Sequence, residues 1–175
     1  MPDIPLSKIK SPSGALGEIE RTSIALANQS ALSSWLDPEL VSVLLCSHPV
    51  SVKKVSRHYE VVSGFRAFHA ARELLDSDES IVVGVMESEE PDLVKWALFE
   101  LITHSLLHLP ASPEAREIVY RQLKKLVSAL RNKHGVKVTK DLSAKSLKTM
   151  MGLEEVRITR ARKRKSELQR MLERS

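Results

Sequence analysis

The stretch that decides the expected fold is YEVVSGFRAFHAARELL, residues 59–75, because a single glycine separates two hydrophobic periodicities. The β-branched residues before Gly64 predict a strand. After it, Phe65, Phe68 and Ala71 recur at helical spacing and predict a helix over residues 65–75. A glycine turn that leads from a strand into a helix directs free N–H groups and the positive end of the helix dipole at one point. The pattern therefore favours an anion-binding turn.

Two side chains near the start of this helix strengthen that expectation. Arg66 is permanently charged and can donate a forked pair of hydrogen bonds to phosphate oxygens. His69 follows three residues later on the same side of the helix, and Gly64 lets the backbone come close to a ligand. The alternatives are that Arg66 is a surface arginine paired with Glu60 or Glu100, and that His69 is a half-buried structural histidine.

Outward from this stretch, the periodicity predicts an α+β fold. Strands are expected at residues 3–9, 49–55, 58–63 and 80–86. The second and third would pair as a hairpin or lie as neighbours, and the last, a continuous apolar run, would be buried. Helices are expected at residues 16–32, 37–46, 89–109, 113–133, 143–153 and 154–174.

Two of these helices carry specific signals. Asp37 as N-cap and Pro38 at the first position predict the start of the helix over residues 37–46, with Leu40, Val43 and Leu44 as its apolar stripe. The helix over residues 89–109, opened by Pro91, is expected to be almost wholly buried. Its internal charged residues and histidines make it too polar for a membrane span.

Charge is distributed unevenly along the chain. Residues 1–110 hold nine Lys and Arg against fifteen Asp and Glu, a net charge of −6. Residues 111–175 hold eighteen against seven, a net charge of +11. This division predicts a body at 1–110 and a basic helical region at 111–175 that contacts a polyanion such as DNA. The alternative is a solvated helical tail.

Composition limits the class of protein. A single cysteine, Cys46, excludes a disulfide framework and a cysteine-based zinc site. It suits the reducing cytoplasm, and the N-terminus MPDIPLSKIK lacks the apolar segment of a signal peptide. We therefore expect a cytoplasmic protein that does not enter a membrane.

The glycine turn resembles that of the ParB/sulfiredoxin superfamily, specifically ParB-like N-terminal (ParB-like nuclease) domains. Those carry G-E-R-R-x-R-A-A after a Y-E-V-V-x strand, and the corresponding residues here are Gly64, Phe65, Arg66, Ala67, Phe68, His69, Ala70 and Ala71. The resemblance covers about residues 3–110. It implies a small mixed sheet flanked by helices, followed by an all-α basic C-terminal region.

The resemblance also implies a nucleoside triphosphate, CTP or ATP, bound with Mg²⁺ at this turn. The best match to a second motif of that family, E-N-x-x-R, is ELITH, in which Glu100 agrees. The expected nucleotide contacts are Gly64, Phe65, Arg66, His69 and His104. Glu100 is the expected metal-supporting carboxylate. If the protein is an enzyme, a weak NTPase or a ParB-like nuclease, Glu100 and His69 are the candidates for proton transfer or water positioning.

The chain departs from those motifs at several positions. Phe65 replaces Glu, Ala67 replaces Arg and Leu101 replaces Asn, while His69 and His104 stand where the family has Arg. The phosphate contacts thus lose permanent charge and gain pH-sensitive donors. The turn also lacks the cysteine that sulfiredoxin chemistry requires, which excludes that activity.

His104 and His108 are four residues apart, so a helix would place both imidazoles on one face, as metal sites require. No third ligand with a defined spacing accompanies them. A structural pair, or a single contact to the site, is the alternative to zinc.

The C-terminal third carries the expected DNA contacts. Residues 144–161 resemble a helix-turn-helix frame with Gly152 at the turn, although Lys148 falls where that frame has a small buried residue. The residues expected to bind nucleic acid are Arg157, Arg160, Arg162, Lys163, Arg164 and Lys165. The alternative is a helical hairpin that packs on the body or forms a homodimer through Leu168, Met171 and Leu172.

Together these features predict a ParB-like nucleotide- and DNA-binding protein of a bacterial plasmid, phage or other mobile element, akin to partition proteins. The alternative is a non-enzymatic regulator, transcriptional or conjugation-inhibiting, in which the fold is a scaffold and the nucleotide site is degenerate.

Overall fold

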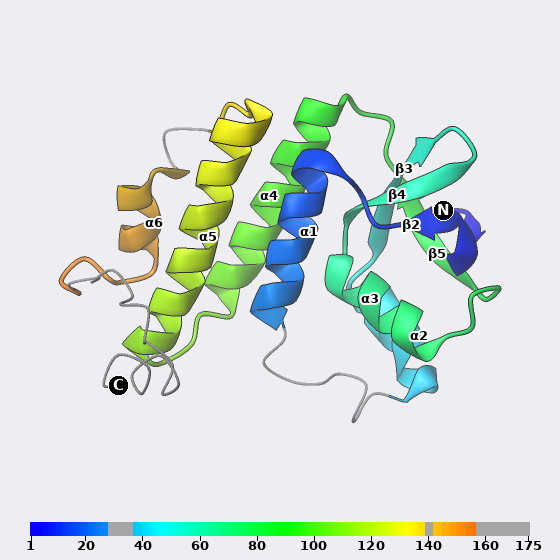
Figure 1. The fold of residues 1–175 in the computed structure, drawn as a ribbon. Helices are drawn as coiled ribbons and strands as arrows, with labels where there is room; N and C mark the ends of the chain where they lie inside the picture. The colour runs from blue at the N-terminus through cyan, green and yellow to red at the C-terminus, as the bar shows by residue number, and fades with distance from the viewer. Residues whose placement is uncertain (28–36, 139–141, 157–175) are drawn as a thin grey trace, which may run out of the picture.

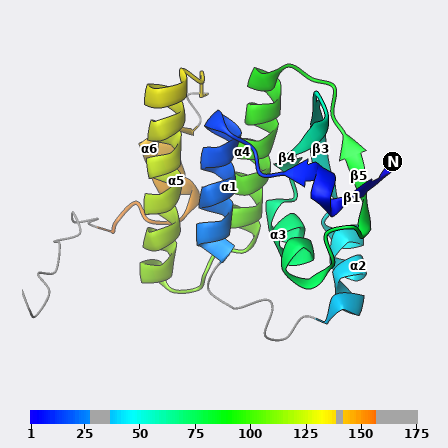
Figure 2. The same ribbon diagram turned by 45° about the vertical axis from the view of Figure 1, so that its right-hand side comes forward.

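A computed structural model describes residues 1–27, 37–138 and 142–156. These residues form a five-stranded mixed sheet and six α-helices (Figure 1). The sheet and two helices lie on one side, and the longer helices stand beside them (Figure 2). The expectation of an α+β fold is confirmed, whereas the ParB/sulfiredoxin fold itself stays a prediction.

The sheet has the strand order β1-β5-β3-β4-β2. Its strands are β1 (Asp3–Pro5), β2 (Ile9–Lys10), β3 (Val50–Val55), β4 (His58–Ser63) and β5 (Ser80–Val85). β3 pairs antiparallel with β4 and parallel with β5, while β1 is antiparallel to β5 and β2 is parallel to β4. The single strand expected at residues 3–9 is thus two short strands separated by a turn of 3₁₀ helix, η1 (Leu6–Lys8).

This turn links opposite edges of the sheet. Pro5 pairs with Ser80 at one edge and Ile9 with Tyr59 at the other. Four residue steps span at most about 14 Å of extended chain. A flat sheet of five strands separates its outer strands by about 19 Å. The sheet must therefore curl strongly enough for three residues to join its edges.

β3 and β4 form a hairpin, one of the two arrangements expected. The register changes along it: Ser51 pairs with Ser63, but Val52 pairs with Val61, so Val62 is an extra residue on β4. A bulge of this kind bends a strand and redirects the chain after it. Here it lies two residues before Gly64, and Val61, Val62 and Ser63 are all buried.

The expectation that the strand over residues 80–86 is buried on both faces is wrong. Ile81 and Val83 are buried, but Val82 between them is 51% exposed. Helices contact the sheet through α3 (Phe65–Leu74) and α4 (Glu90–Leu107). Successive residues of a strand point to opposite faces of the sheet. The residues of β5 on the face without these helices are therefore exposed to solvent even when they are hydrophobic.

Helix α2 (Pro38–Ser47) begins as expected, because the Asp37 side chain accepts a hydrogen bond of 3.0 Å from the Glu39 N–H. The expected apolar stripe is correct at Leu44, which packs against the core, but wrong at its other two residues. Leu40 and Val43 are 47% and 62% exposed, and Val41 is the fully buried residue. α2 packs against α3, and this neighbour selects a different face of a helix that is apolar on several sides.

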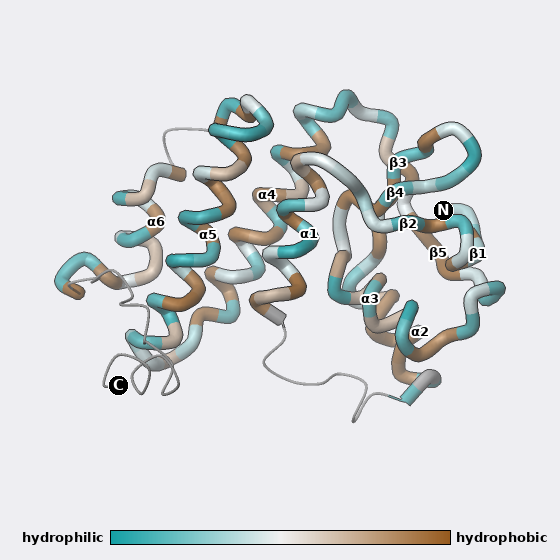
Figure 3. Tube along the Cα trace, in the orientation of Figure 1, coloured by the Kyte–Doolittle hydropathy of each residue, from teal (hydrophilic) through white to brown (hydrophobic). Residues whose placement is uncertain are grey.

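The longer helices pack beside one another: α1 (Gly14–Ala27) contacts both α4 and α5 (Pro113–His134), and the short α6 (Ala144–Met150) lies against α5. In Figure 3, hydrophobic segments alternate with hydrophilic ones along α5, as an amphipathic helix requires. Gly135 adopts φ +63° and ends α5, as expected.

Buried residues of the sheet and of all these helices join one core. The division at residue 110 stays a prediction.

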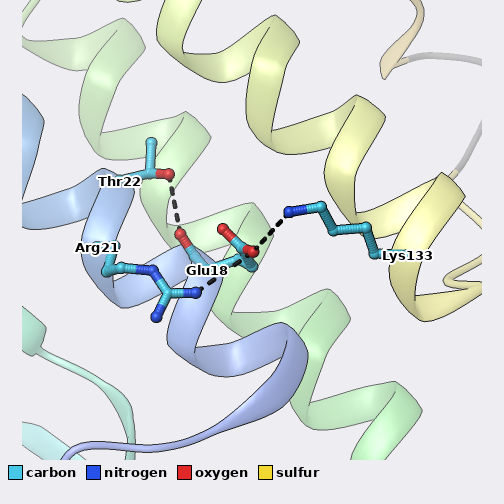
Figure 4. A network of polar contacts seen from close by, with 4 residues as sticks. All are labelled: Glu18, Arg21, Thr22 and Lys133. Atoms are coloured by element: carbon cyan, nitrogen blue, oxygen red, sulfur yellow. Dashed lines mark hydrogen bonds and ion pairs between the residues drawn. The ribbon is translucent and has the colours of Figure 1, made fainter.

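Polar contacts join α1 to α5 at the surface (Figure 4). Glu18 Oε1 lies 3.3 Å from the Arg21 guanidinium and 3.5 Å from Lys133 Nζ on α5. Desolvation raises the pKa of Glu18, but the two cations outweigh it and leave the pKa below its usual value. Because Lys133 and Arg21 are both 67% exposed, this network contributes little to stability compared with the apolar contacts beneath it.

The expectation that α4 is almost wholly buried is wrong as well. Leu93, Ala97 and Leu101 face the core, but Trp96 and Phe99 are 60% and 61% exposed. Within the described ranges, no helix is both long and apolar enough to cross a membrane.

Gly64 and Gly135 provide a matched pair of substitutions. Both have positive φ, so Gly135→Ala should lower the free energy of unfolding by about 1–2 kcal/mol through backbone strain alone, because a Cβ there meets nothing within 4 Å. Gly64→Ala should lose about 1–3 kcal/mol more, since its Cβ would lie 2.7 Å from the Pro49 carbonyl oxygen. Urea unfolding measures both; equal losses would contradict the close contact.

Candidate functional site

The turn at Gly64 joins three elements. Gly64 precedes α3 with φ 73° and ψ 27°, a left-handed conformation. A Cβ here would lie 2.9 Å from the Val50 Cα at the start of β3. The Gly64 N–H donates a hydrogen bond of 3.2 Å to Glu100 Oε1 on α4. The turn therefore holds β3, α3 and α4 together at one point.

A cavity of about 40 Å³ lies beside this turn. Its lining combines polar side chains with core residues: Ser23, His48, Gly64, Phe65, Arg66, Ala67, Ala97, Glu100, Leu101 and His104. One water needs roughly 10–15 Å³ of such volume. The cavity thus has room for a few waters or one small oxyanion, and it is too small for a nucleoside.

Arg66 turns its guanidinium inward. Its Nη1 lies 2.7 Å from His104 Nε2. Because arginine can only donate, His104 Nε2 accepts this hydrogen bond, and the proton of the neutral imidazole is on Nδ1. Among the described residues, Arg66 Nε is buried and has no hydrogen-bond partner. A buried donor without a partner is destabilising, and a small bound acceptor would satisfy it.

Burial perturbs all three ionisable groups of this cluster. Desolvation lowers the pKa of Arg66, although the Glu100 carboxylate raises it. Desolvation, aided by the positive charge of Arg66, lowers the pKa of His104 to about 4. Desolvation also raises the pKa of Glu100, although the hydrogen bond from the Gly64 N–H and the positive charges of His48 and Arg66 lower it in part. Part of the Glu100 side chain is exposed, but its carboxylate reaches inward to the turn.

The cluster can receive an anion through several donors. These are the Arg66 guanidinium and the first N–H groups of α3, which have no partner within their own helix. The charge available is small, because one arginine faces one carboxylate and His104 is neutral near pH 7. Such a site suits a single phosphoryl or carboxylate group better than a densely charged one.

The structure thus brings together Gly64, Phe65, Arg66, Glu100 and His104, which sequence reasoning had grouped. His69 is in a different place. Its Nε2 lies 3.0 Å from Glu20 Oε1 on α1, and the Glu20 side chain is only 7% exposed. Residues three apart in a helix lie on the same side of it, so His69 shares a side of α3 with Arg66. Its imidazole nevertheless bonds to the Glu20 carboxylate of α1 and does not line the cavity.

His104 and His108 form a pair of neighbouring rings tilted by 31°. Their ring centroids are 4.4 Å apart, and His108 Nδ1 donates to the His104 carbonyl oxygen at 3.0 Å, at the end of α4. In the described part of the chain, no group of three or more His, Cys, Asp and Glu residues is arranged to hold a metal ion.

A wide groove of about 800 Å³ opens beside the cavity. His48, Glu100 and His104 line both. The exposed Trp96 and Phe99 of α4 also line this groove. Sequence reasoning missed His48, Trp96 and Phe99. The last two lie in a helix that has apolar residues on more than one face, so periodicity did not separate its exposed face from its buried one.

The residues expected to bind nucleic acid, from Arg157 to Lys165, lie outside the described residues. The part of the helix-turn-helix frame that is described has Leu147, Met151 and Leu153 fully buried. Gly152 adopts φ +61° at the expected turn, and Lys148 Nζ donates to the Glu154 carbonyl oxygen at 3.0 Å. Lysine at this position is therefore accommodated by reaching a backbone acceptor.

No protein-family model, curated protein or solved structure matches this chain.

His104 should make the stability of the protein depend on pH. Its pKa is about 4 in the folded state, below the ordinary value of 6.5. Between these values the unfolded chain binds a proton that the folded chain does not, so the free energy of unfolding should fall as pH falls through this window. Glu100, whose folded pKa is raised, acts with the opposite sign.

The variant His104→Gln isolates the histidine, because glutamine keeps an acceptor for Arg66 but does not titrate. Urea unfolding at about pH 7 and about pH 4.5 should show a smaller acid-induced loss in this variant than in the wild type. The same loss in both proteins would show that His104 is not desolvated.

Proposed function

We propose that this chain is a ParB-like nucleotide- and DNA-binding protein of a bacterial mobile element, and that it holds a phosphoryl group of a nucleoside triphosphate at the Gly64 turn. The observation that carries the proposal is the inward-turned Arg66, with a buried, unpartnered Nε beside a cavity at the start of α3. A phosphoryl oxygen is the acceptor that guanidinium and helix-start N–H groups share.

The size of the cavity determines which part of a nucleotide can enter. About 40 Å³ admits one phosphoryl group, so the other phosphates, the sugar and the base would lie in the adjoining groove. Since His48, Glu100 and His104 line both spaces, the two spaces adjoin, and one ligand that occupied both would contact these three residues throughout.

Glu100 fits the expected role beside Mg²⁺. When magnesium binds with substrate phosphates, the protein commonly provides only one or two carboxylates, and water fills the other positions. The carboxylate of Glu100 faces the cavity that a phosphoryl group would occupy. The metal would neutralise the repulsion between this carboxylate and the phosphates. If the protein hydrolyses its nucleotide, Glu100 is the better candidate for proton transfer, since His69 is engaged by Glu20.

A second candidate function is a non-enzymatic regulator with a degenerate site. Phe65, Ala67 and Leu101 favour it, because the structure has them 4%, 1% and 4% exposed as part of the core. At those positions the resembled family has polar residues that contact the nucleotide. Here the same positions stabilise the fold instead, so the number of groups left to bind phosphate is smaller.

DNA binding is proposed for the basic arm, residues 154–175, from the charge of the sequence alone. The net charge of +11 in residues 111–175 favours a polyanionic partner, and contacts from such a segment to phosphates release counterions. A helical hairpin that packs on the body or forms a homodimer is the alternative for the same residues.

Arg66→Ala should weaken binding of ATP or CTP with Mg²⁺ by about 10- to 100-fold, the effect of losing charged hydrogen bonds. Arg72→Ala is the matched control, because Arg72 lies on the same helix but over the Phe68 ring, 5.6 Å from its centroid. Isothermal titration calorimetry measures both. Absence of nucleotide binding to the folded wild type would favour the regulator with a degenerate site.

Neutralising three residues of the arm, Arg160, Lys163 and Arg164, to glutamine should weaken DNA binding and reduce its salt dependence by about 0.9 per lost phosphate contact. The control removes the same charge from α5 at Lys124, Lys125 and Arg131, all of which are exposed. Fluorescence anisotropy across a salt series measures both variants. Equal losses would show that DNA responds to overall charge rather than to the arm.

A further inference from the structure

Of the six aromatic side chains that the structure describes, five are either buried or strongly exposed, and Tyr59 is partly buried. The chain has seven in total. Phe65, Phe68 and Tyr120 are buried, whereas Trp96 and Phe99 are 60% and 61% exposed. Trp96 and Phe99 are three residues apart on α4, so they lie on the same side of that helix. Large rings left together in water usually mark a surface that binds something.

The groove beside these rings is lined by both aromatic and polar side chains. Helix α4 contributes Trp96 and Phe99. The polar lining residues are Asp92, Lys95, Glu100, Thr103 and His104 of the same helix, and Ser47, His48, Ser51 and Ser63 from the end of α2 and from β3 and β4. A purely apolar ligand would desolvate these polar side chains without replacing their hydrogen bonds. A planar ring with polar edges would match both kinds of side chain.

The groove adjoins the anion cavity, because the two share lining residues. The shared residues Glu100 and His104 lie one and two turns after Trp96 on α4, and all three line the groove. Eight residues of α-helix separate Trp96 from His104 by about 12 Å along the axis. An extended nucleoside triphosphate can bridge this span, with a phosphoryl group at Arg66 and its base beside Trp96.

We propose that Trp96 and Phe99 form the base-binding wall of the nucleotide site, an inference that rests on the proposed function. Stacking on aromatic rings accepts any base, since every base has a π-face, and its strength grows with ring area. The groove therefore binds purine nucleotides more tightly than pyrimidine nucleotides. The recognised class of ligand is a purine nucleoside triphosphate, ATP or GTP, rather than CTP.

The test compares ATP, CTP and inorganic tripolyphosphate, each with Mg²⁺, by calorimetry. Wild type should bind ATP more tightly than CTP, and CTP more tightly than tripolyphosphate. Trp96→Ala should weaken ATP binding by about 5- to 100-fold, as expected for loss of one stacked base, and leave tripolyphosphate binding unchanged. Trp96→Phe should retain most of the affinity. Ile118→Ala, which removes a 52% exposed side chain from α5, is the control for loss of surface hydrophobicity.

The outcomes separate this inference from the function on which it rests. If tripolyphosphate and ATP bind equally well, and Arg66→Ala weakens both, the phosphate site stands and the base-binding wall is refuted. Tighter binding of CTP than of ATP refutes the purine preference. If the wild type binds none of the three ligands, both proposals are wrong.

Tryptophan fluorescence gives a second measurement, which reports contact between the base and Trp96 directly and does not depend on a difference in binding affinity. The chain has two tryptophans, so Trp35→Phe leaves Trp96 as the only one. ATP should quench the Trp96 emission by stacking, and tripolyphosphate should not. Equal responses to both ligands would show that the base does not contact Trp96.

Discussion

The site depends on the close approach of the Gly64 backbone to the backbone of Pro49 and Val50. With the Pro49 carbonyl oxygen 2.7 Å from where a Cβ would stand, no other residue fits without moving the start of β3. The positive φ of 73° then directs the chain from β4 into α3. Because Glu100 accepts the Gly64 N–H, the position of α4 is tied to the same turn. Gly64 thus fixes the position of Arg66 at the start of α3 and determines which residues of α4 the Arg66 side chain contacts.

The structural features that could be predicted are those that residues adjacent in the sequence determine by themselves. The hairpin of β3 and β4, the Asp37 cap and the Gly135 stop each depend on neighbouring residues, and the structure has all three. The grouping of Arg66 with Glu100 and His104 came from the resemblance of two motifs, since no local pattern joins residues that are 34 to 38 positions apart.

The errors came from segments that are apolar on more than one face. Leu40 and Val43 on α2, and Trp96 and Phe99 on α4, are as hydrophobic as their buried neighbours. Periodicity identifies such helices but does not choose their buried side, which the packing partner decides. His69 is a similar case, because Glu20, its partner, is 49 residues away and comes from α1.

Histidine at residue 104 is physically consistent with its surroundings. A second permanent cation 2.7 Å from the half-buried Arg66 would repel it, whereas a neutral imidazole accepts its hydrogen bond and fixes its direction. This choice leaves the cavity with one positive charge opposite the Glu100 carboxylate, so an anion gains little net Coulomb attraction there. A ligand that binds tightly must obtain affinity elsewhere. The adjoining surface that can supply it is the one where Trp96 and Phe99 are exposed. The low net charge in the cavity and the aromatic rings beside it are consistent with one ligand held by both.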